Sequence, residues 1–216
     1  MQEATSKEKV LKKVRKALIQ KTKNPYPNLD YDSKIYSASD ESLDILFAEE
    51  FTKVSGQFVY CENGEEFIQL ISSLTKEREW NNFHAVDKQI MDYLDKGNIK
   101  YTNDEAGLLN SEVGITLCEF LSARTGSIII SSKQLSGRRL SVFPPVHIVV
   151  AYSSQLVFDI KDALSGIKNK YGENIPSMIS AITGPSRSAD IEKTLVMGAH
   201  GPKEVFVFLI DDTINN

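Results

Sequence analysis

The chain is poor in the residues that mark several protein classes. Its 216 residues include two cysteines, Cys61 and Cys118, which lie far apart. Isolated cysteines exclude a disulfide framework and a C-x-x-C metal or cluster motif, so we expect no iron–sulfur centre or other cofactor in this chain. No stretch approaches the roughly 18 consecutive apolar residues of a membrane span, and the N-terminus lacks the apolar core of a signal peptide. These absences predict a cytoplasmic protein.

Phosphate-binding and metal-binding motifs are also missing. Neither G-x-G-x-x-G nor G-x-x-x-x-G-K-[ST] occurs, and no set of His, Asp and Glu has metal-ligand spacing, so we expect no bound metal. The net charge of −4 gives no reason to expect nucleic acid as a partner. What remains is ordinary: 41% hydrophobic and 25% charged residues, in a length that suits one α/β domain.

Positive charge is concentrated near the N-terminus. The stretch from residue 7 to residue 23 contains Lys7, Lys9, Lys12, Lys13, Arg15, Lys16, Lys21 and Lys23. In the same stretch an apolar stripe at helical spacing is formed by Val10, Leu11, Val14, Ala17 and Leu18. Such a helix can dock on a partner protein, lie on a membrane surface, or pack on its own or a sister domain. Because the stripe lacks a Trp or Phe to anchor it in lipid, packing or a protein partner is favoured.

The rest of the chain alternates between helical and strand patterns. Pro25 and Pro27 end the basic helix, and polar sequence follows, so we divide the chain into a basic helix with a linker, residues 1–42, and one α/β domain, residues 43–216. Helices are predicted at 43–54, 65–74 and 88–94, and strands at 58–61, 83–86 and 99–102. This alternation predicts a mostly parallel central sheet with helices on both faces.

Further elements are predicted in the second half. A strand at 114–117 feeds a short helix at 119–123, and a tight Thr-Gly-Ser turn at 125–127 leads into a strand at 128–130. The unbroken apolar character of 128–130 is typical of buried parallel strands. A strand at 178–182 leads into a helix that is capped by Ser186 or Ser188, carries Ile191, Leu195 and Val196, and ends at Gly198. A last strand spans 205–210.

Two polar loops follow the strands at 128–130 and 178–182. The first contains Ser131, Ser132, Arg138 and Arg139, and the second contains Gly184, Ser186 and Arg187. Ligands in open α/β sheets bind at the carboxyl ends of strands. If both loops lie at the same sheet edge, their hydroxyls and guanidiniums can bind a phosphate or a carboxylate. The alternative is that the serines cap a helix and the arginines are solvated.

Four short motifs occur in order along the chain. They are Thr125-Gly126-Ser127, Pro144-Pro145-Val146-His147, the run from Gly184 to Glu192, and Gly198-Ala199-His200-Gly201-Pro202. Together they resemble the LUD domain of the lactate utilization protein C family, from about Phe58 to the C-terminus. The resemblance implies a fold similar to the glucosamine-6-phosphate deaminase, ribose-5-phosphate isomerase and CoA-transferase superfamily. It also implies a cluster-free component that works beside two iron–sulfur proteins oxidising L-lactate to pyruvate.

The sequence departs from this family at one informative place. Where the family commonly has an acidic residue before the Thr-Gly turn, this chain has Arg124, which reverses the local charge. Arg124, Thr125, Gly126 and Ser127 are therefore expected to contact a small anionic ligand. Glu119, which could pair with Arg124, and the loop residue His200 are the candidate catalytic groups.

Alternative functions stay open at this point. The chain can be a stand-alone enzyme of the isomerase, deaminase or CoA-transferase type that acts on a sugar phosphate or an acyl-CoA. It can also be a non-catalytic sensor of lactate or another carboxylate. Homo-oligomerisation is left open by the sequence. His147, in an apolar strand, is expected to be a hydrogen-bonded core residue, and His84 is expected to be structural.

Overall fold

The computed structural model describes residues 5–19, 23–30, 36, 41–188 and 196–213. Contacts divide the chain into two units, residues 1–37 and residues 38–216, which are described separately. The first contains helix α1 (Ser6–Ile19), which buries no side chain within its unit. The helices of the second are α2 (Leu43–Lys53), α3 (Gly64–Glu77), α4 (Lys88–Lys96), α5 (Glu105–Leu109) and α6 (Ile160–Tyr171).

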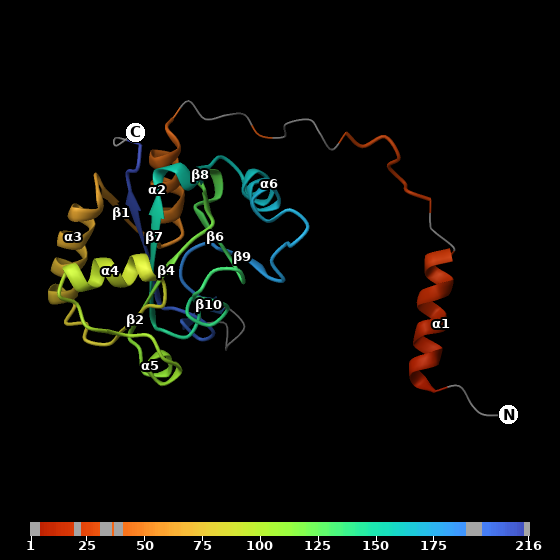
Figure 1. Ribbon diagram of the computed structural model, residues 1–216. Helices are drawn as coiled ribbons and strands as arrows, with labels where there is room; N and C mark the ends of the chain where they lie inside the picture. Colours follow the sequence, from red (N-terminus) through yellow and green to blue (C-terminus); the bar gives the residue numbers. More distant parts are fainter. Residues whose placement is uncertain (1–4, 20–22, 31–35, 37–40, 189–195, 214–216) are drawn as a thin grey trace. The chain divides into compact units, whose positions relative to one another are not determined.

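A six-stranded parallel sheet forms the centre of the second unit (Figure 1). Its strands, in spatial order, are β1 (Gln57–Cys61), β12 (Glu204–Ile210), β7 (Val146–Tyr152), β4 (Val113–Leu117), β2 (Phe83–His84) and β3 (Tyr101–Thr102). Every pairing among them is parallel. The prediction of an α/β fold with a mostly parallel sheet is therefore confirmed.

A second sheet of four strands packs beside the first. Its order is β8 (Leu156–Val157), β5 (Phe120–Ser122), β6 (Ser127–Ser131) and β9 (Ile179–Ile182). The chain enters it directly from the carboxyl end of β4, and the 3₁₀ turns η1 (Ala123–Thr125) and η2 (Ser153–Gln155) lie within its connections. Two short strands, β10 (Arg187–Ser188) and β11 (Val196–Met197), form a separate antiparallel pair.

The described residues of the hydrophobic core form three clusters. α3 and α4 cover one face of the central sheet, with Phe67 and Leu94 among the fully buried residues. α2 and the inner face of the second sheet cover the other, through Phe47, Phe51 and Leu121 among others. α6 covers the outer face of the second sheet. The second face of the central sheet is thus covered by a helix and a sheet together.

The predicted short helix at 119–123 is wrong. Residues 120–122 form β5, which pairs antiparallel with β6, and only residues 123–125 turn, as η1. Three or four residues are too few for periodicity to separate a helix from a strand, and pairing with β6 decides the outcome. The turn at 125–127 does form, with Gly126 at φ 55°.

The predicted parallel pairing of residues 128–130 is also wrong. β6 pairs antiparallel with β5 on one side and with β9 on the other. All five residues of β6 are buried because layers cover both faces of the second sheet. The apolar run therefore correctly predicted that β6 is buried on both faces. Burial alone does not specify whether the neighbouring strands, β5 and β9, run parallel or antiparallel to it.

The predicted helix after Gly184 is contradicted where the structure describes it. Arg187 and Ser188 form β10, and Val196 belongs to β11, which pairs with it. Ser186 donates its backbone N–H to the carbonyl oxygen of Pro202 at 2.9 Å instead of capping a helix. Ile191 and Leu195, predicted on the face of this helix, lie outside the described residues.

Candidate functional site

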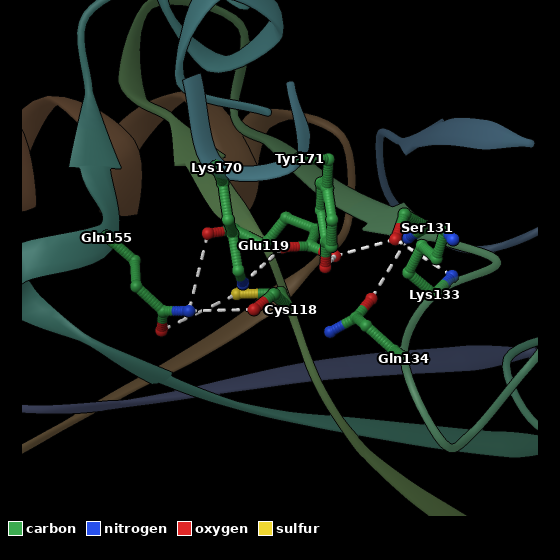
Figure 2. A network of polar contacts seen from close by, with 8 residues as sticks. All are labelled: Cys118, Glu119, Ser131, Lys133, Gln134, Gln155, Lys170 and Tyr171. Atoms are coloured by element: carbon green, nitrogen blue, oxygen red, sulfur yellow. Dashed lines mark hydrogen bonds and ion pairs between the residues drawn. The ribbon is translucent and has the colours of Figure 1, made fainter. Parts of the chain in front are cut away.

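A network of polar side chains surrounds Glu119, at the point where the chain leaves β4 for the second sheet (Figure 2). The carboxylate accepts hydrogen bonds from Ser131 Oγ at 2.6 Å, Tyr171 OH at 2.8 Å and Lys170 Nζ at 2.8 Å. The Glu119 side chain is completely buried, whereas that of Lys170 is 56% exposed. The network therefore fixes the end of α6 to the second sheet.

The partners of Glu119 determine its protonation. Burial by itself would raise the pKa of this carboxyl, but the hydrogen bonds from Lys170, Ser131 and Tyr171 outweigh it, and the pKa is lowered. The hydrogen bond to Glu119 raises the pKa of Lys170. Glu119 is therefore ionised and Lys170 protonated at neutral pH. A buried carboxylate that already accepts three hydrogen bonds is a weak base, and the catalytic role predicted for Glu119 stays a prediction.

Gln155 closes the other side of the network. Its amide nitrogen donates to the Cys118 carbonyl oxygen at 2.7 Å, and its amide oxygen accepts from the Tyr152 backbone N–H at 2.8 Å. These bonds tie the end of β7 to the segment that leaves β4. Burial raises the pKa of the neighbouring Cys118 thiol, so the thiol is neutral.

A second polar group continues from Ser131 along the chain. Ser132 Oγ lies 3.2 Å from Ser177 Oγ, and the guanidinium of Arg138 donates to the same Ser177 oxygen at 2.7 Å. Ser131, the last residue of β6, bonds to Glu119, and the next residue, Ser132, contacts the serine that binds Arg138. The two polar groups are therefore joined at the end of β6. Glu119, Ser131, Ser132 and Arg138, all predicted as site residues, thus lie along one path.

The two predicted ligand loops do not share a sheet edge. β6 and β9 are antiparallel, with Ser131 opposite Ile179 and Ile128 opposite Ile182, so their carboxyl ends lie at opposite ends of the second sheet. The prediction of a common edge is wrong for that reason. Parts of both loops nevertheless reach the same cavity, because the segment after β6 folds back alongside β9.

That cavity, the β9 cavity, has a volume of about 290 Å³. It is lined by Ile130, Arg138, Ser141, Val142, Met178, Ser180, Ala181, Ile182, Thr183, Gly184, Ser186, His200, Gly201 and Pro202. Four predicted site residues therefore meet here: Arg138, Gly184, Ser186 and His200. None of the described residues that line it is acidic, and several hydroxyls accompany the single guanidinium.

Arg187 and Arg139 lie elsewhere. The Arg187 guanidinium donates to the Val54 carbonyl oxygen at 2.6 Å and to Ser55 Oγ at 2.7 Å, and so binds the end of α2. Arg139 pairs with Glu105 at 2.8 Å. It lines a separate cavity of about 270 Å³ that also contains Arg138 and His84. The Gly-Pro-Ser-Arg turn does not aim its guanidinium at the β9 cavity.

The predicted residues 124–127 make contacts within the protein. Arg124 forms a two-point ion pair with Asp159, with Nε–Oδ2 at 2.9 Å and Nη2–Oδ1 at 3.1 Å, and not with Glu119. This pairing lowers the pKa of the Asp159 carboxyl. Thr125 Oγ1 donates to Ser122 Oγ at 2.9 Å. Gly126 lies directly against the backbone of α2.

Ser127 links the turn to the start of the second ligand loop. Its hydroxyl lies 2.7 Å from Thr183 Oγ1, and Thr183 lines the β9 cavity. Gly184 has φ 83° and packs against the carbonyl of Val54, a conformation and an approach that suit glycine alone. The Thr-Gly-Ser turn therefore supports one end of the cavity without lining it.

The histidines differ in environment. His147 is completely buried in β7, with Nε2 2.9 Å from Thr116 Oγ1, while no partner for its Nδ1 is found among the described residues. Burial lowers the pKa of His147 to about 4. His84 is buried beside Thr102. His200 alone lines the β9 cavity.

Sequence reasoning missed Lys170 and Tyr171, because α6 was not predicted, and it also missed Gln155, which lies in η2. The signal was present: Ile160, Ala163 and Ile167 have helical spacing and pack on the second sheet. A larger cavity of about 440 Å³ beside Trp80, at the amino ends of β2 and β3, contains none of the predicted residues. Among the residues that the structure describes, no cluster of three metal-binding side chains occurs. No helix in that part of the chain is long and apolar enough to cross a bilayer.

Comparison with known proteins gives the family. The model of the LUD domain family matches residues 46–210. Lactate utilization protein C 1 of Bacillus mycoides is 30% identical over 167 residues, which cover 68% of this chain and 70% of that protein. Lactate utilization protein C of Bacillus subtilis is 38% identical over 104 residues, which cover 47% of this chain and 43% of that protein.

Among solved structures, a DUF162 family protein from Deinococcus radiodurans has the same fold. It superposes with a TM-score of 0.58 at 18% identity, over 78% of this chain and 96% of that chain. The fold, the family match and the relationship to the Bacillus proteins agree. The chain belongs to the LUD domain family, in its lactate utilization protein C branch.

Proposed function

We propose that this protein is the cluster-free component of a lactate utilization system, in which iron–sulfur partner proteins oxidise L-lactate to pyruvate in the cytoplasm. The observation that carries the proposal is the relationship to lactate utilization protein C 1 of Bacillus mycoides over 68% of the chain. Both thiols of this chain are buried, which raises the pKa of Cys61 to about 12 and also raises that of Cys118. Neutral, separated thiols are poor cluster ligands, which supports assigning the clusters to the partners.

We further propose that the β9 cavity binds a small carboxylate or phosphate. Arg138 supplies a positive charge, and Ser186 and Thr183 supply hydroxyl groups that can orient an anion. The absence of carboxylates among the described lining residues favours an anionic over a cationic ligand. Within the described chain no acidic group pairs with Arg138, whose guanidinium is held by Ser177.

Thermal stabilisation tests this ligand assignment. L-lactate, pyruvate and phosphate, each compared with chloride at constant ionic strength, should raise the unfolding temperature of the full chain. Arg138→Ala should abolish the response to the effective anion. Arg139→Ala is a matched control, because Arg139 is the neighbouring residue but pairs with Glu105 outside the β9 cavity. Equal stabilisation of wild type and Arg138→Ala would remove this cavity as the binding site.

Partner capture tests the role in the system. The tagged full chain, purified from its native host grown with and without lactate, should recover two cysteine-rich proteins whose brown iron–sulfur absorbance appears in the lactate-grown sample. A colourless preparation without partners would contradict the subunit proposal. If the protein in such a preparation still bound a carboxylate, the function of a carboxylate sensor would replace the subunit proposal.

The stand-alone enzyme receives less support from the site. A sugar-phosphate isomerase or CoA-transferase reaction needs a carboxylate free to act as base or nucleophile. Glu119 accepts hydrogen bonds from Ser131, Lys170 and Tyr171, and its lowered pKa weakens both roles. His200, which lines the β9 cavity, stays the better-placed candidate for proton transfer.

A further inference from the structure

Helix α1 places most of its charge and most of its apolar surface on opposite sides, although Lys7, in its first turn, falls on the apolar side. At 100° per residue, Val10, Val14, Ala17 and Leu18 fall on one face of Ser6–Ile19. Lys9, Lys12, Lys13 and Lys16 fall together on the opposite face. No side chain of α1 is buried within its own unit, so the apolar face has no partner there.

The charge on α1 is not balanced within the helix. Six basic residues share it with one carboxylate, Glu8, which is itself bound by Thr5. Within residues 1–37, no ion pair to any of the six is found among the residues that the structure describes. Lysines spaced four apart, as Lys9 and Lys13 or Lys12 and Lys16, repel each other and weaken the helix. An anionic surface beside α1 would relieve this repulsion.

Helix α1 lies outside the part of the chain that the family model matches. The helix precedes the family match at residues 46–210 and lies in a separate unit, residues 1–37. The match to the LUD domain therefore does not account for its two-faced pattern.

We propose that α1 lies on an anionic lipid bilayer and holds the protein at that surface reversibly. Its apolar face, without Trp or Phe, is a weak anchor, so attraction to anionic headgroups provides most of the binding. A groove on a partner protein would bind the apolar face and leave Lys12 and Lys16 in water. The field of a charged bilayer extends about 8–10 Å at physiological salt, close to the diameter of a helix, and so reaches all six cations.

Vesicle sedimentation of the full chain tests the proposal. The chain should bind phosphatidylcholine vesicles containing about one third phosphatidylglycerol and should not bind vesicles of phosphatidylcholine alone. Raising the salt from about 0.1 M to about 1 M, which shortens the screening length from about 10 Å to about 3 Å, should release it. Lys12→Gln with Lys16→Gln should weaken binding roughly 25-fold, about fivefold for each charge removed.

The matched control neutralises two lysines of α6. Lys161→Gln with Lys168→Gln changes the net charge equally, at exposed positions outside α1, and should bind like the wild type. Equal weakening by both double variants would show a general charge effect and overturn the proposal. Failure of the wild type to bind the anionic vesicles would overturn it as well, and would leave an acidic protein partner as the explanation of α1.

Discussion

Replacing Lys170 by methionine should destabilise the protein because it leaves the buried carboxylate of Glu119 without its cation. Removing one partner of a buried ion pair costs about 3–5 kcal/mol. The Lys170 side chain is 56% exposed, so water screens part of its charge, and Tyr171 and Ser131 still donate to Glu119. We therefore expect a loss of about 2 kcal/mol in the free energy of unfolding at neutral pH.

Two comparison variants isolate the unpaired charge. Glu119→Gln keeps an acceptor for Ser131 and Tyr171 and leaves Lys170 free to turn to water, so it should cost only about 1 kcal/mol. Lys168→Met makes the same substitution on an exposed side chain of the same helix and should change stability by less than about 0.5 kcal/mol. Urea unfolding followed by far-ultraviolet circular dichroism measures all three.

The pH dependence provides a further check. The pKa of Glu119 is lowered from its ordinary value of 4.5, so the pair stabilises the fold above that pH and its contribution is lost as the pH falls below it. Without Lys170, burial should raise the pKa of Glu119. Protonation of Glu119 at low pH then removes the free-energy cost of burying an unpaired carboxylate. The difference between wild type and Lys170→Met should therefore narrow below about pH 4.5. A Lys170→Met loss no larger than that of Lys168→Met, or one independent of pH, would refute this reasoning.

Two further predictions concern the fold around the site. Gly126→Ala should destabilise the protein by more than about 2 kcal/mol, because Gly126 has φ 55° and an added Cβ would meet the backbone of Phe51. Gly137 has a similar φ of 62°, but a Cβ added there would meet only the carbonyl oxygen of Leu135, at an ordinary contact distance of 3.9 Å. Gly137→Ala should therefore cost only about 1 kcal/mol in the same urea assay, and equal losses for the two variants would count against the close approach at Gly126. The pKa of His147 is lowered to about 4, so the unfolded chain binds the proton more tightly and stability should fall by up to about 3 kcal/mol between about pH 6.5 and pH 4. His147→Gln should lose less over that range, and an unchanged slope would show that His147 is not the titrating group.

Local pattern was sufficient for much of the central sheet. The apolar runs at 58–61, 114–117 and 205–210 became β1, β4 and β12, and the helical stripes at 43–54 and 65–74 became α2 and α3. These elements follow from sequence because their periodicity directly reports which faces are buried. The ordered motifs are likewise local features of the chain, and they indicate the family independently of the fold.

Tertiary structure decided what periodicity cannot encode. Burial of 128–130 was readable, but the direction of β6 depends on β5 and β9, which contribute its hydrogen bonds. Pairing with β6 is also the reason that residues 120–122 form a strand and not the predicted helix. The candidate site depends on such pairings, because antiparallel β6 and β9 separate two loops that parallel strands would have placed together.

The destinations of individual side chains also depended on the fold. Arg187 was read as part of an anion site but binds the end of α2, while Arg138 returns from a distant loop to the cavity that contains Ser186. Glu119 was predicted as a candidate catalytic group that could pair with Arg124, yet its ionisation is fixed by Lys170, which lies 51 residues away in sequence. Sequence by itself determined the family and most strands of the central sheet. The three-dimensional packing determined which charged groups meet, because charges separated along the chain interact only when the fold places them within hydrogen-bonding distance.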